Sequence, residues 1–283
     1  MPMVRQTLRQ NRAFGGVLFF CDGMLMRTRQ SVLNAKHIVV SVCWYGRAQL
    51  YYDGMVTLLD RLANWRRSWK VTCVLVHTDG SLPTEWREAV AKYDTVRFVD
   101  GTPGYPPLMW RFFDAAKADV HIAVDLDEDI IDILQRFERC WIPHVCHALL
   151  REECLLVSHM ARNQNQWNYR DLSILLPANL IIFVNAKRER VFSNMRQQFS
   201  DFVAQSSARV HADEMDDDAH PITREARPDF YLIDEVFFNA WALPRLSATT
   251  RLVRMRLRGE NLRLLSRVDV ETMRGLDVAR ALR

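Results

Sequence analysis

Three aspartates follow a short apolar run near the middle of the chain. Residues 120–124 (VHIAV) have the length and composition of a β-strand, and Asp125, Asp127 and Asp129 come directly after it. In open α/β sheets, ligands bind in the crevice beyond the carboxyl ends of the strands. Two carboxylates one residue apart can ligate one hard cation, and Mg²⁺ or Mn²⁺ fills its other positions with water and substrate phosphates. The pattern predicts a site for a metal ion and a diphosphate at Asp125 and Asp127.

The same carboxylates have a second interpretation, as the start of a helix. Residues 130–137 (IIDILQRF) have helical spacing, and aspartate is a preferred residue at a helix N-terminus. The aspartates alone do not decide between a metal site and a helix cap, so the surrounding elements have to be considered.

The residues on both sides of these aspartates predict an α/β fold. The predicted strands are residues 37–43, 71–77, 95–99, 120–124, 154–158 and 180–184. The predicted helices include residues 50–65 and 191–203. Short alternating strands and helices are typical of a parallel, doubly wound sheet. We therefore expect a mostly parallel, Rossmann-like central sheet flanked by helices.

The last third of the sequence is less regular. Residues 205–229 are rich in aspartate and have the composition of a loop, which at this length is usually a mobile lid or a linker. The aromatic-rich segment 230–244 follows, with Asp234 and Glu235 at its centre. Residues 253–257 alternate apolar side chains with arginines, which predicts a strand with one arginine face. That face could meet anionic lipid, nucleic acid or donor phosphates, but a solvated edge strand is the favoured interpretation, because charged edges prevent aggregation.

Composition indicates one main domain with a small net charge. The chain has 283 residues, 49% of them hydrophobic, and its 38 Lys and Arg against 34 Asp and Glu are too balanced to indicate nucleic acid as the main partner. Nine arginines against four carboxylates make residues 248–283 basic, so a contact of this end with an anionic surface stays open. We expect a basic and apolar segment at 1–36, a catalytic domain at 37–247 and an arginine-rich C-terminal extension at 248–283.

Cysteine usage and the N-terminal segment bear on the compartment. The six cysteines form no CxxC pair, which favours reduced thiols, and the Cys and His residues between 140 and 159 fit no zinc-site spacing. The apolar run 14–21 is too short to span a bilayer and is not followed by a clear cleavage site. We therefore expect a soluble cytoplasmic protein without a transmembrane segment, and a peripheral membrane contact through the N-terminal segment stays open.

Four motifs, taken in order, resemble one known family. They are a first strand that ends in Tyr45-Gly46, the run Trp69-Lys70-Val71, the tryptophan-arginine-phenylalanine motif at 110–112 with Asp125-Leu126-Asp127 after it, and Asp234-Glu235 ahead of Asn239. Together they resemble the GT-A-type nucleotide-sugar glycosyltransferases, in particular a small, largely viral and microbial group. The chain departs from that group at Val124 and Glu128, and it has no histidine after His220, where many relatives place a metal ligand.

The resemblance implies a role for each matching residue. Asp125 and Asp127 would engage Mn²⁺ or Mg²⁺, which would bridge the diphosphate of a UDP- or GDP-sugar. The residues that would bind the donor are Trp44, Tyr45, Gly46, Asp79, Trp110 and Arg111. Arg111 would pair with the diphosphate or orient the carboxylates, two roles that stay open. Asp234 and Glu235 would act on the acceptor hydroxyl as general base or stabilise an oxocarbenium-like centre, with helix capping by Asp234 as the alternative.

Two rival functions remain. A haloacid-dehalogenase-like phosphatase also places an Asp-x-Asp motif after a buried strand, but it needs the motif near the start of its domain and a different residue where Asp129 stands. A non-catalytic protein could instead keep the fold as a binding module. The sequence does not identify the donor sugar, the acceptor or the stereochemical outcome.

Overall fold

The structure is a computed structural model. It describes residues 31–34, 36–45, 49–65, 71–136, 138–160, 168–169, 172–173, 176–213, 233–256 and 262–264. Gly46 and most of the predicted N- and C-terminal segments therefore lie outside the described residues. Among the residues described, no helix is both long and apolar enough to cross a membrane.

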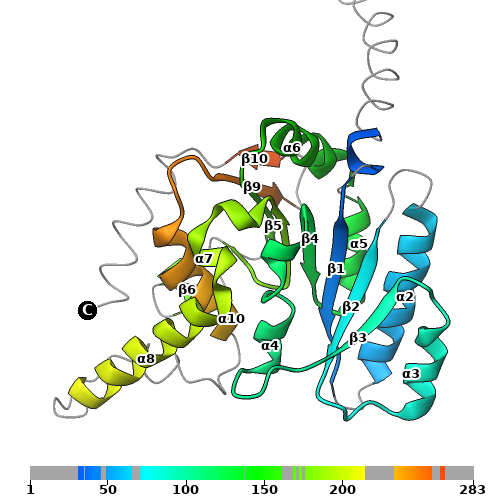
Figure 1. Cartoon of the computed structure of the whole chain (residues 1–283), viewed down its shortest axis with the longest axis horizontal. Coiled ribbons are helices and arrows are strands. Elements are labelled where there is room, and N and C mark those ends of the chain that lie inside the picture. Colours follow the sequence, from blue (N-terminus) through cyan, green and yellow to red (C-terminus); the bar gives the residue numbers. More distant parts are fainter. Residues whose placement is uncertain are drawn as a thin grey trace, which may run out of the picture.

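An eight-stranded mixed sheet forms the centre of the molecule (Figure 1), in the order β10-β9-β5-β8-β4-β1-β2-β3. Its strands are β1 (Ile38–Cys43), β2 (Cys73–Thr78), β3 (Val96–Asp100), β4 (Val120–Val124), β5 (Leu155–Met160), β8 (Leu180–Val184), β9 (Arg251–Arg256) and β10 (Leu262–Leu264). A separate small sheet pairs β6 (Asn168–Tyr169) with β7 (Leu172–Ser173).

The predicted fold class is confirmed, with one change in strand direction. Strands β1, β2, β3 and β4 run parallel, and β5 and β9 are parallel to each other. However, β8 lies antiparallel between β4 and β5, and β10 is antiparallel to β9. The sheet is therefore mostly parallel but not purely so. Because β9 has a neighbour on each side, the prediction that residues 253–257 form an edge strand is wrong.

Helices cover both faces of the sheet. The longer ones are α2 (Gln49–Trp65), α3 (Thr84–Ala91), α5 (Glu128–Arg136), α6 (Glu138–Arg151) and α8 (Met195–Asp213). The shorter ones are α4 (Pro107–Trp110), η1 (Ala115–Lys117), η3 (Ala186–Arg188), α7 (Arg190–Ser193), α10 (Ile233–Val236), the π-helix η4 (Phe237–Ala242) and η5 (Leu243–Arg245). Helix α8 continues to Asp213, so the prediction of a loop is wrong for residues 205–213, and residues 214–229 lie outside the described residues.

The alternation of side chains along the strands separates two cores. In β4, the side chains of Val120, Ile122 and Val124 belong to one buried cluster, together with side chains from α2, α5 and α6. Ala123 belongs to the other, together with side chains from α4, α7, α8 and α10. Both faces of β4 are therefore buried, which is why the strand reads as an uninterrupted apolar run and ends where the charges begin.

Candidate functional site

Asp125 and Asp127 lie where β4 ends, as the sequence predicts. The backbone N–H of Asp125 donates to the carbonyl of Asn179 at 2.8 Å, which extends the pairing with β8 by one residue. The carbonyl of Asp127 accepts hydrogen bonds from the backbone N–H groups of Ile130 and Ile131, both at 3.0 Å, at the start of α5. Asp127 is exposed to solvent and the side chain of Asp125 is 37% exposed. The turn thus starts a helix through its backbone and presents Asp127 to solvent, so the two interpretations of this motif are compatible.

A glycine of α2 allows this turn to lie against the helix. A Cβ atom at Gly54 would overlap the carbonyl oxygen of Leu126, which stands between the two aspartates. The side chain of Leu126 is itself buried in the core. The position of the aspartates therefore depends on a close backbone approach that only glycine permits.

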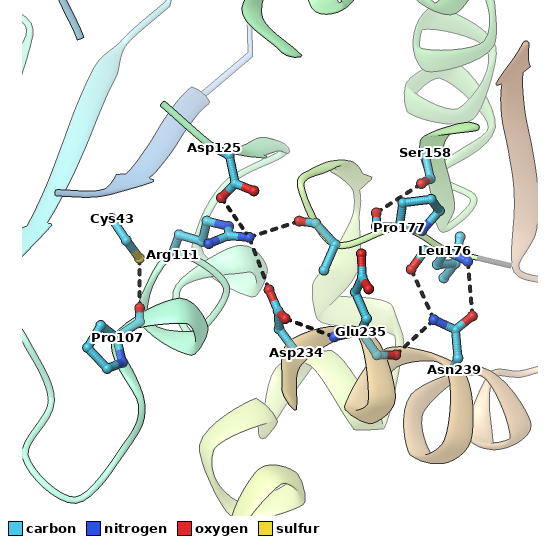
Figure 2. Close-up of polar contacts among 11 residues, drawn as sticks. Cys43, Pro107, Arg111, Asp125, Ser158, Leu176, Pro177, Asp234, Glu235 and Asn239 are labelled. Carbon is cyan, nitrogen blue, oxygen red and sulfur yellow. Dashed lines mark hydrogen bonds and ion pairs between the residues drawn. The ribbon is translucent and has the colours of Figure 1, made fainter. Parts of the chain in front are cut away.

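Arg111 is the centre of the site (Figure 2). Its side chain is only 1% exposed, and Nη2 lies 3.0 Å from Oδ1 of Asp125 and 3.1 Å from Oδ2 of Asp234. The same nitrogen donates to the carbonyl of Ala178 at 3.0 Å. One buried guanidinium therefore joins the end of β4 to α10, two segments far apart in the sequence.

The backbone around Arg111 is fixed from two sides. The thiol of Cys43, at the end of β1, donates to the carbonyl of Pro107 at 2.9 Å in the one-turn helix α4. Nε2 of His121 in β4 donates to the carbonyl of Arg111 at 2.8 Å. Burial lowers the pKa of His121 to about 4, although the backbone of Arg111 and Asp114 oppose this, so the ring is neutral at pH 7. Arg111 is thus tied to the sheet before its side chain reaches the carboxylates.

Asp234 and Glu235 point from α10 toward the end of β4, but their surroundings differ (Figure 2). Both oxygens of Asp234 are engaged, Oδ2 by Arg111 and Oδ1 by the backbone N–H of Glu235 at 3.0 Å. Glu235 is only 5% exposed and its Oε2 has no hydrogen-bond partner. Asn239 donates to the carbonyls of Glu235 and Leu176 and accepts from the N–H of Leu176, which fixes the turn that carries Glu235.

The acidic side chains around Arg111 outnumber the basic ones. Loss of solvent raises the pKa of Asp125 to about 6, with Asp234 and Asp127 adding to the effect and Arg111 opposing it. Burial also raises the pKa of Asp234, against the pull of Arg111, and raises that of Glu235 to about 8 with Asp234 adding to it. A single arginine therefore faces two aspartates, Asp125 and Asp234, and Asp127 adds to the negative charge at Asp125, an excess of the kind that a divalent cation neutralises.

The carboxylates fit a cation in part. Asp125 has one oxygen on Arg111, which leaves the other for a metal ion, and carboxylate oxygens are the preferred ligands of Mg²⁺ and Mn²⁺. Within the described residues, no group of three or more His, Cys, Asp or Glu side chains is arranged to hold a metal. The side chains of Glu128 and Asp129 are outside this description. Among the side chains that the structure describes, Asp125 and Asp127 are therefore the candidates for this cation.

The predicted donor-binding residues are not equally accessible. Trp44 is fully buried and stacks on Trp86, with ring centroids 6.1 Å apart, so its indole is part of the core and is not open to a ligand. Trp110 is 6% exposed and donates its indole N–H to the carbonyl of Tyr105. Tyr45 is partly buried, and Asp79 is exposed after β2, where Oδ1 accepts from the N–H of Ser81 at 2.9 Å. Of the members of this set that the structure describes, Tyr45 and Asp79 remain able to meet a ligand without repacking.

No protein-family model and no curated protein matches the chain. Among solved structures, the chain is similar to the galactosyltransferase LgtC in complex with donor and acceptor sugar analogs, with 13% identity and a TM-score of 0.39. It is also similar to glucosyl-3-phosphoglycerate synthase from Mycobacterium tuberculosis in complex with Mn²⁺, uridine diphosphate and phosphoglyceric acid, with 15% identity and a TM-score of 0.38.

These matches are partial. The first covers 59% of this chain and 64% of the galactosyltransferase, and the second covers 56% of this chain and 60% of the synthase. The chain therefore spans less than two thirds of the solved structures that it matches. The similarity concerns the arrangement of sheet and helices, and the small viral and microbial group stays a prediction.

Sequence reasoning missed two residues of the site and named a third without giving it a role. Gly54 and Ala178 act through backbone contacts, and no residue pattern marks such contacts. Asn239 was named in the fourth motif but its role was not predicted, although it follows Glu235 by four residues and therefore lies on the same side of a helix.

Proposed function

We propose that the chain is a metal-dependent glycosyltransferase that moves a sugar from a nucleotide-diphosphate donor to an acceptor hydroxyl. One observation carries the proposal: one of the two predicted metal-binding aspartates, Asp125, and one of the two predicted catalytic acids, Asp234, meet at a single buried guanidinium. Arg111 lies 3.0 Å from Asp125 and 3.1 Å from Asp234. A buried ion network of this kind is weak evidence for stability alone, and perturbed carboxyl groups cluster at functional sites.

Asp125 and Asp127 would hold the cation. When bound, Mn²⁺ or Mg²⁺ would neutralise charge on the leaving diphosphate as a Lewis acid and orient the donor. Asp127 is exposed where a donor would arrive, and Asp125 stands behind it, fixed by Arg111. Tyr45 and Asp79, at the carboxyl ends of β1 and β2, would contact the nucleotide.

Arg111 would position the carboxylates and not touch the donor. Its side chain is only 1% exposed and its Nη2 is already shared by two carboxylates and a carbonyl, so a diphosphate could not reach the guanidinium without repacking. This replaces the predicted contact between Arg111 and the donor with the orienting role that the sequence left open. Trp44 and Trp110 would likewise support the site through packing.

Glu235 would be the carboxyl that receives the proton of the acceptor hydroxyl. Both oxygens of Asp234 are engaged, whereas Oε2 of Glu235 is buried and without a partner. Its pKa of about 8 lies near neutral pH, which suits a general base. Asp234 would hold Arg111 and the helix turn in place. In a retaining reaction, the same carboxyl would stabilise the oxocarbenium-like centre instead.

The test is hydrolysis of a panel of UDP- and GDP-sugars with and without Mn²⁺. We expect turnover of at least one donor that depends on the metal, and its loss in Asp127→Asn with the fold retained. The matched control is Asp132→Asn in the following helix α5, because the side chain of Asp132 is 46% exposed and forms a surface ion pair with Arg61. Equal activity of Asp127→Asn and the wild type would contradict the metal role.

The departures from the family pattern at Val124 and Glu128 favour one alternative, a binding module that has lost catalysis. Calorimetry with UDP- and GDP-sugars plus Mn²⁺ separates the two, because a scaffold of this kind would bind neither donor. The phosphatase alternative is tested with a generic phosphate ester, which a haloacid-dehalogenase-like enzyme would hydrolyse and a glycosyltransferase would not.

A further inference from the structure

A cavity lies away from the carboxylate site, between α7, α8, the end of the π-helix η4 and η5. It has a volume of about 610 Å³, which falls within the usual range for small-molecule sites. We call this cavity the basic groove. The polar residues that line it are Arg190, Gln198, Asp201, Gln205 and Arg245, and Trp241 forms its aromatic side.

The aromatic side of the basic groove is held rigidly. The guanidinium of Arg245 lies 3.4 Å from the ring centroid of Trp241, and its Nη1 donates to the carbonyl of Trp241 at 3.0 Å. The indole N–H of Trp241 donates to Oε1 of Gln198 at 3.1 Å. These contacts fix the guanidinium plane before any ligand arrives, which lowers the entropy lost on binding. Trp241 also sits on a π-helix, a feature frequently found at functional sites.

The groove contains more donors than acceptors. Arg190 is exposed at the start of α7 and makes no ion pair within the described part of the chain. Gln198 has its oxygen occupied by Trp241, so its amide nitrogen is the group left to face a ligand. Asp201 is the single carboxylate, and its Oδ1 already accepts from the side chain of Gln197 at 2.8 Å. Two arginines, of which Arg245 is held in place by Trp241, against one carboxylate favour a ligand that is rich in acceptor oxygens.

We propose that the basic groove binds a phosphate monoester of a sugar or a similar polyol. A phosphate dianion presents acceptor oxygens to Arg190 and Arg245, the residue type best suited to phosphate. The remaining oxygen of Asp201 and the amide of Gln205 would bind hydroxyl groups of the polyol. The volume admits a molecule of monosaccharide size with its phosphate. This proposal is independent of the glycosyltransferase proposal, because the groove shares no residue with the carboxylate site.

Calorimetry on the full chain with EDTA present tests the proposal, because chelation removes any contribution of a metal at Asp125 and Asp127. The probes are glucose 6-phosphate, inorganic phosphate and glucose. We expect glucose 6-phosphate to bind more tightly than either of the others, and its affinity to fall as salt is added. Arg190→Met and Arg245→Met should each weaken it by about tenfold, the loss expected for one charge-assisted contact.

Two controls make the result specific. Lys187→Met removes an exposed cation three residues before Arg190 and outside the groove lining, so it should leave the affinity unchanged. Asp127→Asn should also leave it unchanged, and this separates the groove from the proposed transferase site. Arg190 takes no part in the stack on Trp241, so Arg190→Met keeps the test valid if Arg245→Met unfolds the protein.

Three outcomes would overturn the proposal. They are no binding of glucose 6-phosphate at millimolar concentration, equal affinity for glucose 6-phosphate and inorganic phosphate, and undiminished binding by Arg190→Met. Loss of donor hydrolysis in Asp127→Asn together with normal binding of glucose 6-phosphate would support both proposals separately.

Discussion

The two faces of the sheet bury different chemistry. The face covered by α2, α5 and α6 is packed mainly with aliphatic side chains, such as Val120, Ile122 and Val124 of β4, with Trp44 and Trp141 among them. The face covered by α4, α7, α8 and α10 is rich in phenylalanine and also encloses His121, Arg111 and the two acids of α10. Neighbouring residues of the same strand thus serve an apolar core on one side and a polar network on the other.

The difference shows how the site is stabilised. Apolar cores tolerate changes of shape as long as volume and pattern are kept, whereas a buried polar network loses much of its value when one partner is removed. On the polar face, such a network lies where β4 meets α10. The carboxylates that could do chemistry belong to it. Substitutions on the two faces should therefore differ in kind as well as in size.

The largest effect is expected for Arg111→Met. The variant leaves Asp125 and Asp234 near each other without the cation between them, which costs roughly 3–5 kcal/mol for a buried pair that loses one partner. Urea unfolding at pH 7 measures the loss. Adding Asp234→Asn should recover part of it, because one of the two stranded charges is then absent.

Arg196→Met is the matched control for Arg111. Arg196 also lies over a phenylalanine, with its guanidinium 5.3 Å from the ring centroid of Phe113, but its side chain is 49% exposed. We expect a loss of no more than about 1 kcal/mol, typical of a surface contact. Similar losses in the two variants would show that the network around Arg111 contributes nothing beyond packing.

The next effect concerns the aliphatic face. In Gly54→Ala the new Cβ would overlap the carbonyl of Leu126, so α2 or the turn between the aspartates must shift. We expect a loss of about 1–3 kcal/mol in free energy of unfolding, as for an overpacked core, together with reduced donor turnover.

Gly104→Ala provides the comparison for Gly54. Gly104 has φ +81°, and a Cβ atom added there would have nothing within 4 Å, so alanine introduces backbone strain without a clash. It should lose roughly 1–2 kcal/mol from the left-handed conformation and keep its turnover. Equal turnover of the two variants would contradict a dependence of the aspartate turn on Gly54.

Elements buried on both faces could be predicted from the sequence to within a residue or two. The runs 120–124 and 180–184 match β4 and β8 because each is a continuous apolar stretch with polar boundaries. The direction of β8 could not be predicted, since an apolar run reads the same in both directions. The polar residues 205–213 have loop composition, but they continue a helix whose earlier turns are anchored by Phe199 and Phe202 in the core.

The candidate site was predicted as a set of residues but not as a network. The carboxylates at 125, 127, 234 and 235 were found from their positions after apolar segments and from the family resemblance. The sequence left two roles open for Arg111 and could not decide between them, because its contact with Asp234 spans 123 residues of sequence. The burial of Trp44 could not be found either, because an aromatic residue after a strand has the same pattern whether it packs inward or meets a ligand.

A smaller effect, and one that depends on pH, is expected for Glu235→Gln. Burial raises the pKa of Glu235 from 4.5 to about 8, so between these values the folded protein binds a proton that the unfolded chain releases. The free energy of unfolding of the wild type therefore falls as pH rises through this range. Glutamine has no charge to bury, so the variant should be about 2 kcal/mol more stable than the wild type at pH 9, and this advantage should shrink toward pH 6. Urea unfolding at both pH values measures it, and an advantage that does not change with pH would argue against a protonated Glu235.

The smallest effect comes from His121 and has the opposite sign. Burial lowers the pKa of His121 from 6.5 to about 4, so between these values the unfolded chain binds a proton that the folded protein does not. Its stabilising contribution is therefore present above pH 6.5 and is lost as pH falls toward 4. His121→Gln keeps a nitrogen that can donate to the carbonyl of Arg111 but cannot take up a proton. The loss of stability between pH 7 and pH 5 should be about 1 kcal/mol smaller in the variant than in the wild type. Part of the loss should remain, because burial also lowers the pKa of His77 to about 4. Identical pH profiles for the two proteins would mean that the polar face of the sheet accepts a charged His121.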